Sequence, residues 1–537
     1  MNRLTYGLNT LWMLSCLRER RKFERATHDV ESTQRALLLK VLERNSTTAF
    51  GAAHGFDRIR SPSDFQNRVQ PRSYDDFRED IERIARGEHN VLTRDSVEIF
   101  EPTSGTTSGE KLIPYTADLR HQFQRAISAW IGDLFSTRPA VRRGKAYWSI
   151  SPAFGLRRQT VGGIPIGFED DTEYLGFFER QFASRLMAVP GDVANIPDID
   201  EFRYQTLLHL MLADDLSLIS VWNPTFLTVL LDSIDANCDR LRRDLRTAHS
   251  GRRSQKVELI LRSEDSLPDK LRLLWKDLVL ISCWTDAAAA HGLSELTGLF
   301  PEVEIQPKGL IATEAIVSYP LVDRPGAALA IRSHFFEFRA SGSDDLRLAH
   351  ELAVGERYEV VVTTGGGLYR YQLKDLIEVR GFENECPLIR FVGKANRVSD
   401  LVGEKLGEPH VNSVLKRAFA SVGLGLPPAM LVPSNGQPPH YRLVLGGIAH
   451  ANGRENELKR IVSDGLEENP YFRHAVAIGQ LGPLEVHVLG DEEYSPWQAY
   501  ETKCLTEGQK QGDIKPTVLG VGILWDPMLR HPSPRSQ

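Results

Sequence analysis

The sequence predicts an α/β fold, because segments with the apolar spacing of helices alternate with short strand-like runs along most of the chain. Helices are expected at residues 205–213, 224–236 and 268–278, and strands at 146–150, 278–282 and 358–364. This alternation favours a mixed sheet in a large N-terminal lobe. A shorter pattern of helices and strands follows a charged, glycine-rich connector, and it predicts a second, smaller domain at residues 394–537.

An apolar segment at residues 4–17 precedes these elements. It includes polar residues, is too short to cross a bilayer, and is followed by RERRKFERA instead of a small-residue cleavage site. A docked amphipathic helix is therefore favoured over a signal peptide. Further helices are expected at 30–42 and 73–86, and in the second the predicted N-cap is Ser73 and the helix ends at Gly87.

Composition and charge narrow the class of protein. The chain has 537 residues, of which 41% are hydrophobic and 25% are charged, as in an ordinary globular protein. Its net charge of −6 gives no reason to expect nucleic acid as a partner, and no stretch predicts a membrane span. The five cysteines are scattered without a C-x-x-C pair, which predicts free thiols in the cytoplasm. They are Cys16, Cys238, Cys283, Cys386 and Cys504.

The segment TSGTTSGEK at residues 103–111 is the first candidate for chemistry. Glycines let the backbone turn tightly and point several N–H groups at one anion, while serine and threonine add hydroxyl donors, so a nucleotide phosphate is the expected ligand. The spacing does not fit a Walker loop or a G-x-S-x-G nucleophile elbow, and the expected context is strand–loop–strand. The alternative is a polar hairpin loop without a ligand.

Four further segments carry candidate residues. Glu314 in ATEAIVSYP could hold Mg²⁺ beside a polyphosphate, or form a structural ion pair. In TTGGGLYRYQLKDLIEVRGF the three glycines permit close packing against a flat ligand. Asp375 could accept hydrogen bonds from both hydroxyls of a ribose, or it could instead cap a helix or form an ion pair. The lysines of the connector at 393–411 are either functional or a solvated surface, and Lys515 near the C-terminus is weak evidence alone.

The order and spacing of these segments resemble the Gretchen Hagen family of auxin-responsive acyl acid amido synthetases, within the adenylate-forming superfamily. The matching pieces are SYDDFREDIERIARGE, TSGTTSGEKLIPYT, the ATE of GLIATEAIVS, TTGGGLYRYQLKDLIEVRGF and LIRFVGKANRVSDLVGEKLGE. The resemblance extends over residues 45–520 and is weakest at 140–300 and in the C-terminal domain.

The resemblance implies a site residue by residue. Ser104, Gly105, Thr106, Thr107, Ser108 and Gly109 match the loop that holds the ATP phosphates. Thr313 and Glu314 match the second nucleotide motif, in which the glutamate is a Mg²⁺ ligand. Asp375 matches the ribose-binding aspartate, Lys405 the hinge lysine that contacts the α-phosphate, and Lys515 the late lysine. The chain departs from the family in three places: Ala312-Thr313 replaces a double serine, Lys374 replaces a glycine, and the late motif lacks its tyrosine and an intervening residue.

The fold and activity follow from the same resemblance. It implies an adenylate-forming enzyme fold, with an ATP- and acyl-acid-binding domain at 1–393 and a small, mobile α+β cap domain at 394–537. The expected enzyme is a ligase that uses ATP and Mg²⁺ to activate a carboxylic acid as acyl-AMP. It then transfers the acyl group to an amine, which the resemblance implies is an amino acid. Acyl-CoA ligase and a non-catalytic nucleotide- or acid-binding relative are the alternatives.

Acyl-pocket residues are expected after Thr116 and around Trp148 and Trp222. The sequence identifies neither the acid, the amine nor the oligomeric state.

Overall fold

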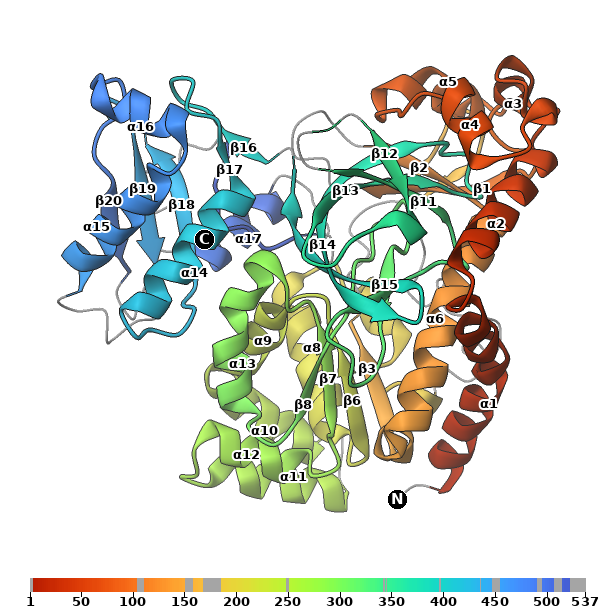
Figure 1. The fold of residues 1–537 in the computed structure, drawn as a ribbon. Helices are drawn as coiled ribbons and strands as arrows, with labels where there is room; N and C mark the ends of the chain where they lie inside the picture. The colour runs from red at the N-terminus through yellow and green to blue at the C-terminus, as the bar shows by residue number, and fades with distance from the viewer. Residues whose placement is uncertain are drawn as a thin grey trace. The chain divides into compact units, whose positions relative to one another are not determined.

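A computed structural model gives the fold of most of the chain as an α/β structure (Figure 1). Contacts divide the chain into two compact units. Unit 1 comprises Met1–Trp222, Val229–Trp284 and Leu299–Phe391, and unit 2 comprises Asn223–Thr228, Thr285–Gly298 and Val392–Gln537. The structure describes residues 3–103, 111–149, 158–167, 185–247, 251–340, 343, 345–395, 397–434, 436–446, 454–489, 495–506 and 514–521.

The N-terminal segment is a helix, α1 (Arg3–Ala26), that lies against the long helix α6 (Ala117–Thr137) (Figure 1). Trp12 of α1 meets Phe135 of α6 edge to face, with ring centroids 5.2 Å apart. The Asn9 amide donates to the carbonyl oxygens of Arg142 and Gly144 at 3.0 and 2.8 Å. The expected docked helix is confirmed and is longer than its apolar part. Across the described residues, no helix has both the length and the hydropathy that a membrane span requires.

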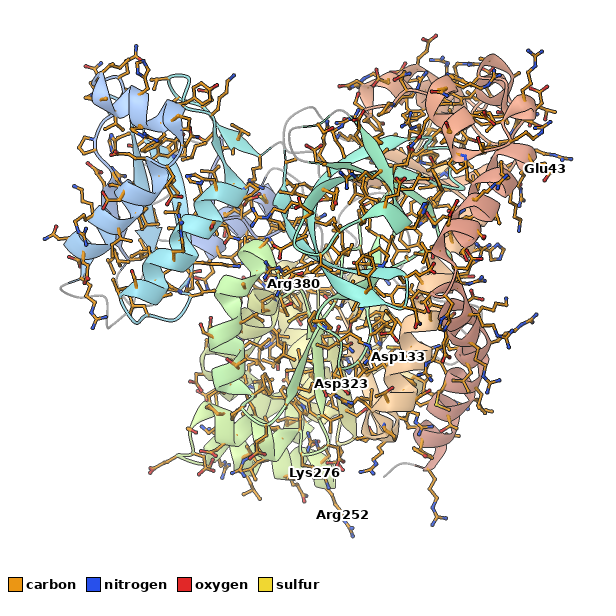
Figure 2. The ribbon with its side chains drawn as sticks, viewed as in Figure 1. Glu43, Asp133, Arg252, Lys276, Asp323 and Arg380 are labelled. Atoms are coloured by element: carbon orange, nitrogen blue, oxygen red, sulfur yellow. The ribbon has the colours of Figure 1, made fainter. Side chains whose placement is uncertain are left out.

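Charged side chains fix α6 to its neighbours. Asp133 on α6 forms an ion pair with Arg20 of α1 at 3.2 Å and accepts from the backbone N–H of Val322 at 2.9 Å. Arg138, directly after α6, pairs with Asp323 at 2.6 Å. Figure 2 labels the two acidic residues of these ion pairs, Asp133 and Asp323. One helix thereby holds α1 and the segment after β9 together.

A group of short helices follows α1, and one of them differs from its prediction. The expected helix at 73–86 is instead a 3-10 turn at Asp75–Phe77 followed by α5 (Arg78–Ala85). Ser73 is not its N-cap, because its N–H and hydroxyl both donate to the Asp76 carboxylate, at 2.7 and 2.8 Å. The other helices of this group are α2 (Val30–Arg44), α3 (Ala49–Ala53) and α4 (Pro62–Arg68).

The strands of unit 1 form three sheets, whereas the sequence predicted one mixed sheet. The first has the order β2-β1-β5-β4 and consists of β1 (Val97–Thr103), β2 (Lys111–Thr116), β4 (Arg158–Gln159) and β5 (Pro165–Ile166). The second has the order β3-β6-β7-β8 and is parallel throughout. Its strands are β3 (Lys145–Trp148), β6 (Leu216–Ser220), β7 (Leu280–Cys283) and β8 (Glu304–Pro307).

Helices connect the parallel strands, as parallel topology requires. They are α8 (Ile199–Leu212), α9 (Pro224–Ala236), α10 (Cys238–Thr247), α11 (Arg252–Arg262), α12 (Leu267–Leu274) and α13 (Leu293–Leu299). Every residue of β6 and β7 is buried, which is typical of strands covered on both faces.

The third sheet has seven strands in the order β12-β11-β13-β14-β15-β10-β9. The long strand β14 contains a β-bulge beside β13, because Val361 pairs with Gln372 but Glu359 pairs with Leu376. Lys374 lies within this bulge with a left-handed φ of 60°. The strands are β9 (Ser318–Pro320), β10 (Ala327–Leu329), β11 (Phe335–Ala340), β12 (Leu346–Leu348), β13 (Arg357–Thr363), β14 (Tyr371–Glu383) and β15 (Cys386–Lys394).

Unit 2 has its own core around a three-stranded sheet in the order β18-β19-β20. Strands β18 and β19 pair antiparallel, whereas β19 and β20 pair parallel. The predicted connector contains a small hairpin of β16 (Val398–Ser399) and β17 (Leu406–Gly407). The other elements are α14 (Glu408–Ser421), β18 (Ala429–Ser434), β19 (His440–Leu445), α15 (Glu455–Leu466), α16 (Pro470–Ala477), β20 (Glu485–Val488) and α17 (Pro496–Thr506). The separate roles assigned to residues 1–393 and 394–537 stay a prediction.

Candidate functional site

The first motif lies at the tip of the β1–β2 hairpin. Thr103 at the end of β1 pairs with Lys111 at the start of β2, so both ends of the intervening loop are held together. This is the strand–loop–strand context that the sequence predicted. The predicted phosphate-binding residues Ser104, Gly105, Thr106, Thr107, Ser108 and Gly109 lie outside the described residues, and their role stays a prediction.

The second motif is a tight turn between β8 and β9. The Ala312 N–H donates to the Ala315 carbonyl oxygen at 3.0 Å, so Thr313 and Glu314 occupy the tip of the turn. Two tyrosines from the other motifs hold this tip. The Tyr115 hydroxyl, on β2, donates to the Thr313 carbonyl oxygen at 2.5 Å. The Tyr371 hydroxyl, at the start of β14, donates to Glu314 Oε1 at 3.2 Å.

The Tyr371–Glu314 contact has an electrostatic signature. Burial is the main cause that raises the pKa of Tyr371 far above its usual value of 10.0, and the charge of Glu314 adds to it. Tyr371 therefore stays protonated and donates to the carboxylate throughout the physiological range. Glu314 itself is only partly buried, so the rest of its carboxylate can reach a ligand.

The triple glycine of the third motif packs against protein. A Cβ at Gly365 would lie 2.3 Å from Asp118 Oδ2, and one at Gly366 would lie 2.7 Å from the Pro114 carbonyl oxygen. At Gly367 φ is +94°, a left-handed conformation that favours glycine. The protein's own packing therefore accounts for these glycines, and the expected packing of a flat ligand against them stays a prediction. They allow the turn after β13 to lie directly on β2 and on the start of α6.

A buried hydrogen-bond chain joins this turn to the second motif. Gln122 Oε1 accepts from the Gly365 N–H at 2.9 Å and lies 2.8 Å from His334 Nδ1. The Ile316 N–H donates to His334 Nε2 at 3.2 Å, so Nδ1 is the protonated nitrogen that donates to Gln122. Burial lowers the pKa of His334 from 6.5 to about 3, with a further contribution from the charge of Arg125. His334 is therefore neutral and fixes the spacing of the two turns.

Asp375, the predicted ribose ligand, lies on β14 at the bulge and is fully buried. A carboxylate without exposed surface reaches a ribose only after neighbouring groups move, so this assignment stays a prediction. Between the pairs Val361–Gln372 and Glu359–Leu376, β14 has two more residues than β13, and Asp375 keeps the buried side of the alternating pattern with Leu373 and Ile377. A second buried charge stabilises the start of β14: Arg370 pairs with Glu337 through two 2.9 Å hydrogen bonds, and the side chains are 4% and 1% exposed.

The two predicted catalytic lysines belong to unit 2. Lys405 is exposed at the β16–β17 hairpin with a left-handed φ of 45°. Its neighbour Glu404 is buried and accepts from the N–H groups of Leu401 and Val402 at 2.7 and 2.8 Å. The Asn469 amide donates to the Lys405 carbonyl oxygen at 3.3 Å. The backbone is thus fixed on both sides of a side chain that faces solvent.

Lys515 is partly buried in the last described segment, 514–521. This segment is fixed to the core of unit 2, because the Leu431 N–H donates to the Val518 carbonyl oxygen at 2.8 Å. The Thr517 hydroxyl also donates to Glu408 Oε1 at 2.6 Å. The roles of Lys405 and Lys515 stay predictions, as do those of Thr313 and Glu314.

One group of candidates had only partly been expected from the sequence. The carboxyl ends of the four parallel strands bring together Trp148, Ser220, Val221, Trp222, Cys283, Trp284 and Lys308, which we call the carboxyl edge. Ligands of open α/β sheets bind at such an edge. Trp148 and Trp222 had been expected near the acid, but Lys308 and Trp284 had not. The available signal was a lysine directly after a strand, in PKGLIATE, six positions before Glu314.

Comparisons with known proteins cover most of the chain. The model of the GH3 family N-terminal domain matches residues 19–305, and that of the GH3 family central domain matches residues 327–394. Indole-3-acetic acid-amido synthetase GH3.3 of Arabidopsis thaliana is 22% identical over 535 residues, which cover 89% of this chain and 88% of that protein. Jasmonoyl–L-amino acid synthetase JAR6 of Nicotiana attenuata is 25% identical, covering 74% of this chain and 75% of that protein.

The solved structure of AtGH3.15 acyl acid amido synthetase in complex with 2,4-DB has the same fold. Its TM-score is 0.81 at 19% identity, and the match covers 96% of this chain and 95% of that one. The fold and the order of motifs define an adenylate-forming, amide-forming ligase. The chain belongs to the GH3 family. It activates a carboxylic acid as its acyl-adenylate, with ATP as the adenylate donor, and joins the acyl group to an amine.

Proposed function

We propose that the chain joins a small carboxylic acid to the α-amine of an amino acid, with Mg²⁺-bound ATP as the activating nucleotide. The observation that carries this proposal is the convergence of three motifs in unit 1. Tyr115 of the phosphate-loop hairpin and Tyr371 of the aspartate-bearing strand both bind the turn that presents Thr313 and Glu314. Side chains from three motif-bearing segments thus meet around one turn, which supports the proposal.

The residues around this turn fit a magnesium ion. Mg²⁺ is usually held by one or two carboxylates, with substrate phosphates and waters completing the shell. Glu314 supplies one partly exposed carboxylate, oriented by the Tyr371 hydroxyl. No cluster of three or more metal-binding side chains occurs among the described residues, consistent with an ion that arrives with its nucleotide. When bound, Mg²⁺ would neutralise the charge of the pyrophosphate that leaves.

The proposed reaction has two steps. In the first, a carboxylate oxygen of the acid attacks the α-phosphorus of ATP and pyrophosphate leaves, while Lys405 stabilises the negative charge that develops on the phosphate. In the second, the amine nitrogen attacks the acyl carbonyl carbon, AMP leaves, and the nitrogen loses a proton to a base. No covalent enzyme intermediate is required. We assign Lys515 a supporting contact to the phosphate.

We also propose that the enzyme acts in the cytoplasm. All five cysteines are thiols and not disulfides, and four of them are buried, namely Cys16, Cys283, Cys386 and Cys504. Free thiols are typical of proteins in a reducing compartment, which is also where ATP and free amino acids are available.

Separating the two steps tests the role of Lys405. We expect Lys405→Ala to slow acid-dependent ATP–pyrophosphate exchange by at least tenfold, because the charge matters most as the pentavalent phosphorus forms. Acyl transfer from a supplied acyl-adenylate should be affected less. Lys459→Ala on α15 is the matched control, since Lys459 is another lysine of unit 2 outside every motif. Equal slowing of both steps, or of neither, contradicts the role.

A panel of carboxylic acids tests the activity itself. The parent enzyme should exchange pyrophosphate with at least one acid and should release AMP in proportion to added amino acid. Mass spectrometry should detect the acyl–amino acid conjugate. The absence of exchange with every acid of a broad panel contradicts acid activation, and AMP release that depends on coenzyme A contradicts the acceptor.

A further inference from the structure

Lys308 is a buried cation at the carboxyl edge that none of the nucleotide motifs uses. It directly follows β8 and is 4% exposed. Its ammonium nitrogen donates to Ser220 Oγ at 2.7 Å and to the Val221 carbonyl oxygen at 3.1 Å. Both acceptors are neutral. Among the described residues, no carboxylate forms an ion pair with Lys308.

Three indoles surround this ammonium or adjoin it. Its nitrogen lies 4.8 Å from the centroid of the Trp222 ring and 6.0 Å from that of Trp148, both within reach of a cation–π interaction. Trp284 is 5.4 Å from Trp222, centroid to centroid. All three tryptophans are partly exposed, although Lys308 is buried. The ammonium is therefore buried beside indoles that keep part of their own surface accessible.

The electrostatics of Lys308 are incomplete without an anion. Burial lowers the pKa of Lys308 from 10.5 to about 7, and among the described residues only the weakly acidic thiol of Cys283 opposes this shift. A buried cation normally has a charged partner. Two buried donors in the neighbouring strands, Trp148 Nε1 in β3 and Ser282 Oγ in β7, have no hydrogen-bond acceptor among the described residues. The described part of this edge thus offers several donors, and none of its side chains carries a negative charge.

We propose that Lys308 binds an anionic oxygen of the acid substrate, whose apolar body lies on the indole faces of Trp148, Trp222 and Trp284. This inference rests on the proposed function, because it assumes that an acid binds this chain. Lys308 is then a residue that sets acid specificity. Either the carboxylate that is activated or a second acidic group on the same molecule can supply the oxygen. A flat acid fits the indoles better than a branched aliphatic one, since ring faces stack.

The central experiment compares Lys308→Met with the parent enzyme. Methionine keeps an unbranched side chain and removes the buried charge together with its hydrogen bonds to Ser220 and Val221, so urea unfolding of the variant accompanies the binding measurement. Lys276→Met is the matched control, because Lys276 is exposed just before β7, at the opposite end of the same parallel strands (Figure 2). The probe is a series of aromatic monocarboxylates and the corresponding dicarboxylates, titrated without ATP and followed by tryptophan fluorescence.

We expect Lys308→Met to weaken acid binding at least tenfold, whereas Lys276→Met should leave it unchanged. If Lys308→Met binds both the monocarboxylates and the dicarboxylates more weakly, Lys308 binds the carboxylate that is activated. If the variant loses only the preference for dicarboxylates, Lys308 binds the second acidic group. Unchanged binding of every acid that binds the parent overturns the inference. If acids bind the parent more tightly than Lys308→Met but none of them supports pyrophosphate exchange, the proposed function is contradicted and the acid-binding role of Lys308 is retained.

Proton uptake gives a second readout that packing alone would not change. An anion beside Lys308 favours its charged form, so acid binding near pH 7 should take up a fraction of a proton. Calorimetry of the parent in two buffers of different ionisation enthalpy measures this uptake, and it should vanish in Lys308→Met. Equal uptake in parent and variant also overturns the inference. Trp284→Leu removes one partly exposed indole. It should weaken the binding of aromatic acids more than the binding of aliphatic acids.

Discussion

The motif-bearing turns of unit 1 and its carboxyl edge differ in the partners that their buried polar groups have. At the turns, each buried group has a partner from the chain itself: His334 binds Gln122 and the Ile316 N–H, and Arg370 pairs with Glu337. At the carboxyl edge, Lys308 has two neutral acceptors and aromatic neighbours. The buried groups of the first region are paired within the protein, whereas the buried cation of the second acquires its counter-charge from a ligand.

This difference matches what each region has to recognise. Adenylate formation uses ATP whichever acid is activated, so the turns can be rigid and can hold Glu314 in one position through Tyr371. The acid differs between relatives, which include an indole-3-acetic acid-amido synthetase and a jasmonoyl–L-amino acid synthetase. A surface of aromatic faces and one cation can be adapted by single substitutions, whereas a linked turn network cannot.

The largest expected effect comes from the turn itself. Glu314→Gln keeps an oxygen for the Tyr371 hydroxyl but removes the charge that Mg²⁺ requires, so exchange at saturating acid should fall by about a hundredfold. The Mg²⁺ concentration at half-maximal rate should rise, while acid binding at the carboxyl edge stays unchanged. Glu302→Gln, at an exposed position before β8, is the control. An unaltered Mg²⁺ dependence would show that Glu314 has only a structural role. Weaker acid binding in Glu314→Gln would show that the turns and the carboxyl edge do not act independently.

The hydrogen-bond chain of the turns predicts a pH effect on stability. Burial lowers the pKa of His334 from 6.5 to about 3, so below pH 6.5 the unfolded chain takes up a proton that the folded chain does not. Stability is therefore lost as the pH falls from about 6.5 toward 3. At pH 5 the loss from this group amounts to roughly 2 kcal/mol, at about 1.4 kcal/mol for each pH unit.

His334→Gln tests this effect, because glutamine offers the same donor and acceptor without titrating. Between pH 7 and pH 5 the variant should lose less stability than the parent, measured by urea unfolding at each pH. His89→Gln, at an exposed site, should follow the parent. Coincident pH profiles of the parent and His334→Gln would mean that His334 titrates normally and that the turns are not a closed network.

The sequence predicted those parts of the fold that local signals encode. The helices at 30–42 and 224–236 match α2 and α9, because apolar spacing and flanking residues define them. The prediction for Ser73 was wrong, because a serine before acidic residues can either accept a hydrogen bond as an N-cap or donate one to a carboxylate, and here it donates to Asp76.

The candidate site divides in the same way. Thr313, Glu314 and Asp375 were found because each lies in a short motif, but nothing local indicated that Tyr115 and Tyr371 would meet one turn. The carboxyl edge depends on strands separated by more than 150 residues between Trp148 and Lys308. Only the parallel pairing brings them together, and a single sequence does not encode that pairing in any one segment.

The smallest expected effect concerns the bulge beside Asp375. Lys374 adopts a φ of 60°, where a side chain with a Cβ is strained and glycine is not. Lys374→Gly should stabilise unit 1 by roughly 0.5–1 kcal/mol, after allowance for the greater freedom of glycine in the unfolded chain. Lys374→Ala keeps the Cβ and should give no gain, which separates strain from loss of charge. A destabilised Lys374→Gly would show that the lysine side chain, whose Nζ lies 2.5 Å from Gln372 Oε1, supports the bulge.

A competition between acceptors tests the central claim most directly. The enzyme, ATP, Mg²⁺ and an acid that supports exchange are mixed with equal concentrations of an amino acid mixture and coenzyme A, and the acylated products are identified by mass spectrometry. An acid–amine ligase that acts on an acyl-adenylate predicts AMP release matched by an acyl–amino acid amide, with the same rate when coenzyme A is omitted. A thioester of coenzyme A as the product, with no amide formed from any amino acid, would contradict the account.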